Sequence, residues 1–103
     1  MASLALKVIL TLLIQAKEKV EIGGFYSHYK NPNYLYQVSD IAVSTDKSTG
    51  EHIVVIYSGC NDDKKGSVIW TRPLEDFLSE VEFEGKMVPK FSKQPPTINN
   101  KYT

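Results

Sequence analysis

The stretch Ile53-Val54-Val55-Ile56-Tyr57 constrains the fold of this 103-residue chain more than any other feature. β-Branched residues lose side-chain freedom in a helix and pack well on a pleated sheet, so the run predicts a β-strand. Its apolar residues fall on both faces of that strand, which predicts a position in the interior of a sheet. Polar, glycine-containing turns at 45–50 and 59–66 bound the strand on either side.

Shorter strand patterns surround this run, over residues 25–30, 34–43 and 67–71, with a hairpin over 81–88. The apolar alternation of 34–38 changes phase in 41–43, which predicts a bulge near Ser39-Asp40. Asn31-Pro32-Asn33 predicts a turn, and Pro73 fits the first position of a short helix. These patterns predict a mainly β fold of about five short strands and one short helical turn, curled into an antiparallel sheet or small β-barrel.

The N-terminal segment follows a helical period instead. Between residues 4 and 19, polar side chains recur every three or four positions, namely Lys7, Thr11, Gln15 and Glu18. The pattern predicts an amphipathic α-helix with Ser3 as its N-cap and Gly23-Gly24 beyond its end. Its broad apolar face has two possible roles: covering the open end of the barrel, or docking through residues 4–19 to a partner protein or in a homodimer.

Length and composition favour one domain, divided into a helix over 1–22, the β domain over 23–91 and a flexible tail over 92–103. The single cysteine, Cys60, excludes an intramolecular disulfide and favours a reducing, cytoplasmic location. The apolar run near the N-terminus is too short for a membrane span, and no basic residue precedes it as in a signal peptide. We therefore expect no membrane partner.

The formal net charge is zero, but charge is unevenly distributed along the chain. Residues 21–84 carry five basic and eleven acidic side chains, a net of −6, whereas both ends are positive. A negative surface repels a polyanion, so non-specific nucleic-acid binding by the core is disfavoured.

Four segments are familiar in order and spacing: Gly24-Phe25-Tyr26-Ser27-His28-Tyr29-Lys30, Tyr36-x-Val38, Val54-Val55-x-Tyr57 and Trp70-x-Arg72-Pro73-Leu74-x-x-Phe77. Through them, residues 23–91 resemble the family known as domain of unknown function 1653, small domains from bacteria and phages. The resemblance implies an SH3-like β-barrel and implies no activity. The N-terminal helix, the Asn-Pro-Asn turn and the longer 59–66 loop depart from the family pattern.

Candidate site residues come from strand alternation. Tyr26, His28 and Lys30 are predicted on one strand face, where an aromatic, titratable and cationic trio could line a pocket for an anionic or planar ligand. The alternative is an ordinary solvated sheet face.

Trp70 and Arg72 alternate onto one face in the same way, and Tyr57 belongs to the neighbouring predicted strand. Together they could form a stacking platform for a base, sugar or peptide proline. The competing interpretation makes Trp70 a buried anchor and Arg72 an ion-pair partner of Glu75 or Asp76.

An enzyme remains an alternative, using His28 with Cys60 or a carboxylate. No motif fixes these groups together, and the neighbouring Asp62 and Asp63 would raise the pKa of a Cys60 thiol. No metal or cofactor is implied, and His52 is expected to point outward. The sequence thus favours a non-catalytic binding or adaptor module with an aromatic and basic patch formed by Tyr26, His28, Lys30, Tyr57, Trp70 and Arg72.

Overall fold

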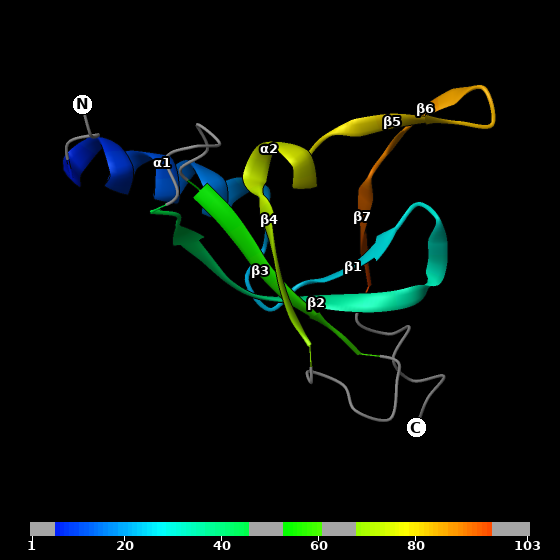
Figure 1. Cartoon of the computed structure of the whole chain (residues 1–103), viewed down its shortest axis with the longest axis horizontal. Coiled ribbons are helices and arrows are strands. Elements are labelled where there is room, and N and C mark those ends of the chain that lie inside the picture. Colours follow the sequence, from blue (N-terminus) through cyan, green and yellow to red (C-terminus); the bar gives the residue numbers. More distant parts are fainter. Residues whose placement is uncertain (1–5, 46–52, 61–67, 96–103) are drawn as a thin grey trace.

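The computed structural model describes residues 6–45, 53–60 and 68–95, and shows a leading helix followed by antiparallel strands (Figure 1). The elements are, in chain order, α1 (Leu6–Lys19), β1 (Phe25–His28), β2 (Asn31–Val43), β3 (Ile53–Gly59), β4 (Ile69–Pro73), α2 (Leu74–Phe77), β5 (Glu80–Phe83), β6 (Lys86–Pro89) and β7 (Phe91–Gln94). The predicted fold class, mainly β with an N-terminal helix, is confirmed. Ser3, His52, Asp62 and Asp63 lie outside the described residues, so the expectations for them stay predictions.

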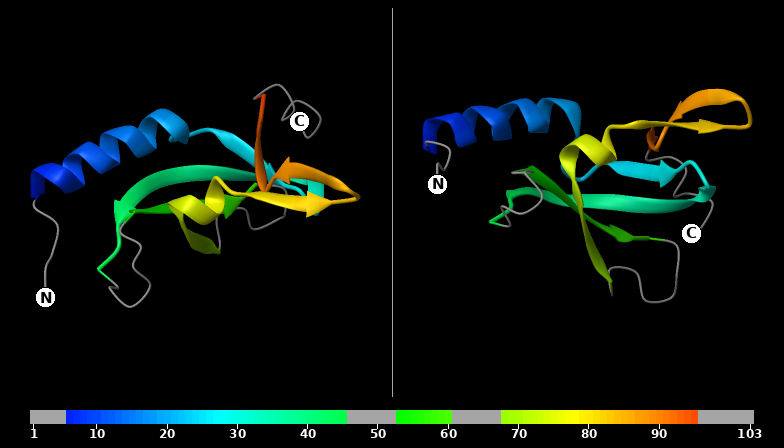
Figure 2. Two further views of the ribbon diagram at one scale, coloured as in Figure 1. Left: turned by 90° about the horizontal axis from the view of Figure 1, so that it is seen from above. Right: turned by 45° about the horizontal axis from the view of Figure 1, so that its top comes forward.

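Five strands form one antiparallel sheet in the order β4-β3-β2-β1-β7, so the β-branched strand β3 is interior, as predicted. The long strand β2 lies at the centre of the sheet and bends at a register shift between Val38 and Asp40. This is the predicted bulge, which an extra unpaired residue, Ser39, produces. The bend lets one strand continue around the curl of the sheet (Figure 2).

The curled sheet stays open. Within the described residues no pairing joins the two edge strands, β4 and β7, so the hydrogen-bonded ladder does not close into a barrel. Side chains span the opening instead, because the Arg72 guanidinium on β4 lies 5.2 Å from the centre of the Phe91 ring on β7. The domain is therefore a curled open sheet of five strands with a separate two-stranded sheet, β5-β6, and its seven described strands exceed the predicted five.

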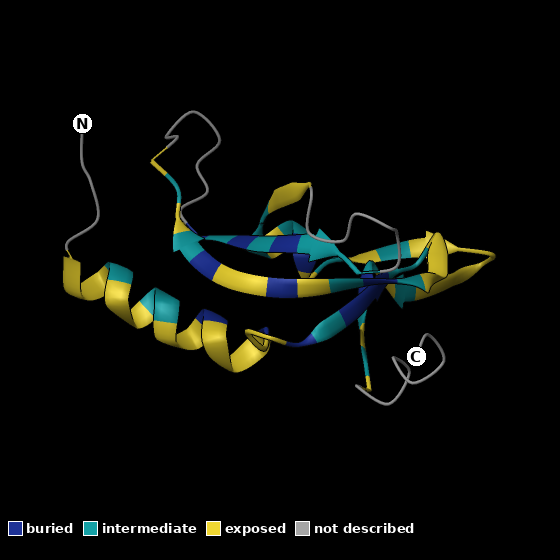
Figure 3. Ribbon diagram, turned by 90° about the horizontal axis from the view of Figure 1, so that it is seen from below, coloured by how far each residue is buried: buried dark blue, intermediate teal, exposed yellow. Residues whose placement is uncertain are grey.

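Helix α1 packs on β2 and β3 through its C-terminal half. Ala16 and the following Val20 are buried in the core, whereas Leu6, near the N-terminal end of the helix, is exposed (Figure 3). The chain leaves the helix through Gly23, whose φ of 87° suits glycine, and whose N–H donates to the Val38 carbonyl at 2.7 Å. This bond anchors the helix exit to the sheet.

The core lies on the concave face of the sheet, and both helices contribute to it. Pro73 precedes α2 with a φ of −55°, and the single turn of α2 places Phe77 in the core at 2% exposure. The Phe77 ring stacks on Phe91 with 4.4 Å between centroids and meets the edge of Tyr26 at 5.2 Å. Aromatic rings therefore join α2, β1 and β7.

The predicted hairpin is present as β5 and β6, and projects from the sheet at the opposite end from α1 (Figures 1 and 2). Its two turn residues, Glu84 and Gly85, have φ values of 53° and 80°. Positive φ at both positions defines the tight turn whose twist matches that of paired strands. The Phe83 ring meets Tyr29 at 5.4 Å, which ties the hairpin to the end of β1.

Two boundaries differ from expectation. The turn after β1 is Tyr29-Lys30, because Asn31 already pairs with His28, so 31–33 begin a strand. The last strand extends to Gln94, three residues beyond the predicted end of the β domain at Phe91. Residues 92–94 pair with β1, although the sequence assigned them to the tail. The strand was not predicted because Lys93 and Gln94 show no apolar alternation. Among the described helices, none is long and apolar enough to cross a membrane.

Candidate functional site

One face of the sheet carries most of the candidate residues. Tyr57 pairs directly with Trp70, and Val55 with Arg72, so the alternating side chains Tyr57, Trp70 and Arg72 share a face. On the other side of the curl, His28 pairs with Phe91. The predicted alternation of Trp70 and Arg72 onto one strand face is therefore present, and the role of this face as a ligand site stays a prediction.

Arg72 is held by groups from several elements. Its Nε donates a 3.1 Å hydrogen bond to the Tyr57 hydroxyl, and its Nη1 forms an ion pair with Asp76 on α2, one of the two predicted partners. Asp76 also accepts a 2.6 Å hydrogen bond from the Lys90 ammonium. With the Phe91 ring beside the guanidinium, these five residues form what we term the Arg72 cluster: Tyr57, Arg72, Asp76, Lys90 and Phe91.

Asp76 and Arg72 both keep their charges at neutral pH. Lys90 and then Arg72 hydrogen-bond to Asp76 and lower its pKa below 3.8, and together they outweigh the effect of burial. Burial alone would lower the pKa of Arg72, but the hydrogen bonds to Asp76 and Tyr57 more than offset burial and raise that pKa. Arg72 therefore remains a fixed cation with 31% of its side chain exposed.

Tyrosine rings extend the cluster along β2. The Tyr36 ring meets Tyr57 edge-on at 5.4 Å, and Tyr34 lies 5.0 Å from Tyr36. Burial and the neighbouring Tyr57 raise the pKa of Tyr36, so its hydroxyl stays protonated at neutral pH. Tyr34 reaches across to β3, where a side-chain Cβ at Gly59 would collide with its hydroxyl and ring.

His28 borders the same aromatic group as a neutral imidazole. Burial, followed by the positive charges of Arg72, Lys30 and Lys90, lowers the pKa of His28 below its ordinary value of 6.5. The backbone N–H of Lys30 donates to Nδ1 at 3.2 Å, which assigns the ring proton to Nε2. The ring packs against Phe91 at 5.1 Å, so His28 is partly a structural residue.

Trp70 is 50% exposed, and the alternative that it is a buried anchor is wrong. It belongs to the edge strand β4, which among the described strands pairs with β3 alone. Tyr26 and Tyr57, by contrast, are buried. The Tyr26 hydroxyl accepts a 3.0 Å hydrogen bond from the Glu21 N–H at the helix exit, so the Tyr26 ring supports the fold beneath the site.

Lys30 lies in the turn after β1, beyond the strand face on which it was predicted. Its ammonium is 5.9 Å from the centre of the Tyr29 ring, at the rim of the aromatic group. The six predicted residues differ in their exposure to solvent. Trp70 and Lys30 are exposed, His28 and Arg72 are partly exposed, and Tyr26 and Tyr57 are buried.

The alternative pairing of Cys60 with His28 lacks support in the geometry. Cys60 follows β3, and its N–H donates a 2.9 Å hydrogen bond to the Leu35 carbonyl on β2. Leu35 alternates with Tyr36, so it faces away from the side of the sheet where His28 packs on Phe91. Among the described residues no three His, Cys, Asp or Glu side chains gather as a metal ion would require.

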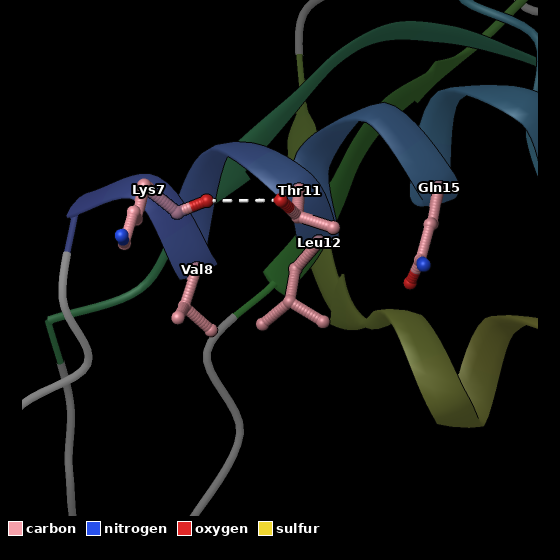
Figure 4. A pocket seen from close by; sticks show the side chains of 5 residues that line it. All are labelled: Lys7, Val8, Thr11, Leu12 and Gln15. Atoms are coloured by element: carbon pink, nitrogen blue, oxygen red, sulfur yellow. Dashed lines mark hydrogen bonds between the residues drawn. The ribbon is translucent and has the colours of Figure 1, made fainter.

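A shallow pocket of about 390 Å³ lies elsewhere, along α1 (Figure 4). Lys7, Val8, Thr11, Leu12 and Gln15 line it. The Thr11 hydroxyl donates to the Lys7 carbonyl at 3.0 Å, so it already has a partner within the helix. This pocket offers one cation and no pair of converging polar groups from different elements, and the Arg72 cluster is the stronger candidate site.

The sequence did not predict that four further residues would lie beside the candidate residues, namely Lys90, Phe91, Tyr34 and Tyr36. Lys90 and Phe91 adjoin the predicted domain end, and only the pairing of β7 with β1 brings them beside His28. Tyr34 and Tyr36 did carry a signal, because they alternate on one strand in phase with Val38.

Comparison with known proteins gives one positive result. Residues 24–93 match the family model described as "Protein of unknown function (DUF1653)", and this span contains every described residue of the Arg72 cluster. Neither the comparison with curated proteins nor that with solved structures gave a match. Since the family model covers more than half of the sequence, the chain belongs to the DUF1653 family of proteins of unknown function.

Proposed function

We propose that this domain is a non-catalytic binding module for a small ligand that joins a planar ring to an anionic group, as a nucleotide does. The observation that carries the proposal is a tethered, partly exposed Arg72 on the same sheet face as the half-exposed Trp70. The cation can bind the anionic group of such a ligand, and the aromatic ring two positions before it on the same strand face can stack on the planar ring.

Arg72 supplies the anion contact. Its Nε and Nη1 are occupied by Tyr57 and Asp76, and within the described part of the chain other N–H groups of the guanidinium remain for a phosphate or carboxylate. Because these bonds already fix the side chain, binding an anion costs little further side-chain entropy. With Lys90 and Asp76, the group carries one net positive charge.

Trp70 supplies the planar contact. Base–aromatic stacking contributes roughly 1–3 kcal/mol per base in proteins that bind single-stranded nucleic acids. Tyr57 is its cross-strand neighbour on β3, and Trp70 itself is 50% exposed, which leaves its ring accessible to a ligand. The net charge of −6 over residues 21–84 favours a small anion over a polyanion.

Fluorescence titration of the full chain tests this proposal, since Trp70 is the only tryptophan. Adenosine monophosphate should change the emission in a saturable way. Adenosine alone and inorganic phosphate alone should each bind at least tenfold more weakly, because each lacks one of the two contacts. Equal responses to adenosine and its monophosphate would remove Arg72 from the site, and no response to any probe would refute the proposal.

Calorimetry of variants distinguishes loss of a ligand contact at Trp70 from damage to strand β4. Trp70→Leu should weaken binding of adenosine monophosphate at least tenfold, whereas Ile69→Leu should bind as the wild type does. Ile69 is also exposed but alternates onto the opposite face of β4. Equal losses in the two variants would indicate damage to β4 rather than loss of a ligand contact.

A further inference from the structure

The two edges of the sheet differ in how they are protected. Exposed sheet edges usually carry charge or proline, which discourage pairing with another chain. β7 follows this rule, because Lys93 forms an ion pair with Glu21 and Pro95 follows the strand. On the β4 edge, charge and proline are confined to the C-terminal end, at Arg72 and Pro73, while Val68, Ile69 and Trp70 before them are 53%, 67% and 50% exposed.

Apolar side chains are exposed on both faces of β4, because Ile69 and Trp70 alternate. Among the described strands β4 pairs only with β3, so its outer backbone groups face away from the sheet. An apolar edge with available backbone donors and acceptors suits the addition of another strand. We infer that the added strand is β4 of a second copy, which makes a two-fold dimer with a continuous sheet.

The sequence of β4 is complementary to itself in one antiparallel register. With Thr71 on the two-fold axis, Trp70 lies opposite Arg72 of the second copy, and Ile69 lies opposite Pro73. Each indole then lies beside the aliphatic part of an Arg72 side chain, whose guanidinium keeps its bonds to Tyr57 and Asp76, and the two threonines meet at the centre. Placing Trp70 on the axis would instead set Arg72 against Val68 and the two indoles against each other.

The electrostatics of the edge also favour a second copy over a charged partner. Between Val68 and Pro73 the only ionic side chain is Arg72, and Asp76 balances its charge. Two copies of this edge therefore meet without repulsion between unbalanced like charges. Pro73 lacks an N–H and ends the ladder, so the interface is short and the dimer is expected to be weak.

Sedimentation equilibrium of the full chain over a concentration series tests the inference. The wild-type average mass should rise from 11.6 kDa towards twice that value at micromolar to millimolar concentration. Thr71→Lys and Thr71→Glu should each weaken association at least tenfold, because identical charges then face each other across the axis. An equimolar mixture of the two variants should associate again, because opposite charges now meet.

Controls on other exposed apolar positions locate the interface. Met87→Lys on β6 and Leu10→Glu on α1 should associate as the wild type does, and circular dichroism should show all variants folded. A wild-type mass that does not change with concentration would overturn the inference. So would wild-type association of Thr71→Lys, or a loss of association in Leu10→Glu, which would assign the contact to α1.

The dimer would place the proposed ligand contacts, Trp70 and Arg72, beside a second copy, but the Thr71 variants separate the two proposals. Thr71 alternates onto the face opposite Trp70 and Arg72, so its variants leave the ligand contacts in place. Thr71→Lys should therefore remain monomeric while still binding adenosine monophosphate.

Discussion

Asp76 is the residue on which the candidate site depends most, because its carboxylate binds both Arg72 and Lys90. Through these bonds one carboxylate joins α2 to β4 and to the segment that precedes β7. The sequence predicted half of this arrangement, since Asp76 lies four positions after Arg72. Lys90 was not predicted, because it lies 14 positions further along and only the returning hairpin brings it back.

Replacing Asp76 tests this description. Asp76→Asn should lower the free energy of unfolding by about 1–2 kcal/mol, a range that allows for solvent screening of a partly exposed pair. Denaturant unfolding measures the change. Glu75→Gln removes an exposed charge from the same helical turn and should change the stability by less than about 0.5 kcal/mol. Equal effects of the two substitutions would contradict a specific role for Asp76.

His28 gives the domain a pH dependence near neutrality. Its pKa in the folded protein is below the 6.5 of an unfolded chain, so folding favours the neutral ring. The unfolded state therefore binds more protons as the pH falls through 6.5, and the free energy of unfolding should fall over that window. The free energy of unfolding of His28→Gln should change less between pH 7.5 and 5.5 than that of the wild type. NMR titration of the wild-type imidazole should give a pKa below 6.5. A measured pKa above 6.5 would contradict this environment.

At the scale of elements, the short helix α2 matters more than its single turn suggests. Phe77 fills the space between the curled strands, and its ring contacts Tyr26, Tyr57 and Phe91. Pro73 predicted the start of this short helix, but nothing in the sequence predicted that Phe77 would become a centre of the core.

Truncation of this ring should be costly. Phe77→Ala should lower the free energy of unfolding by about 3–5 kcal/mol, as for other large-to-small changes in a core. The adjacent Leu78→Ala serves as the matched control, because Leu78 is 42% exposed and should lose about 1 kcal/mol or less. A loss below 1 kcal/mol for Phe77→Ala in denaturant unfolding would mean that α2 is not packed on the sheet.

The contact between β2 and β3 can be tested at Gly59. A methyl group there would collide with the Tyr34 ring, so Gly59→Ala should displace Tyr34 from Tyr36 and cost about 1–3 kcal/mol. Ser58→Ala, one position earlier on the same strand, should be nearly neutral. Thermal unfolding compares the two. An unchanged Gly59→Ala would mean that Tyr34 does not pack over β3.

At the scale of the whole molecule, local sequence patterns predicted which elements form better than they predicted which elements lie side by side. The β-branched strand β3, the bulge in β2, the hairpin and α1 all follow from residue types and periodicity. Strand order does not, because the position of a strand in a sheet depends on contacts between distant segments. This is why Trp70 could be read as a core residue: its composition suits burial, and only its edge position exposes it.

The same limit applies to α1. Its period predicted a helix with a broad apolar face, and the structure uses the C-terminal half of that face to cover the sheet. Leu6, Leu10 and Ile14 recur every four positions along a side of α1 that is turned away from the packed residues Ala16 and Val20, and they remain exposed. The two predicted roles of α1, packing and docking, thus concern different faces of one helix. Packing is observed, and docking stays a prediction.

If Trp70 and Arg72 form one ligand-binding face, both side chains should respond to the same ligand. Titration of the ¹⁵N-labelled chain with adenosine monophosphate tests it most directly, by following the Trp70 indole N–H and the Arg72 Nε–H in NMR spectra. Both signals should shift together, with one dissociation constant, while signals from α1 stay in place. Shifts confined to Lys7, Thr11 and Gln15 on α1, or no shift at Trp70 and Arg72, would contradict the account.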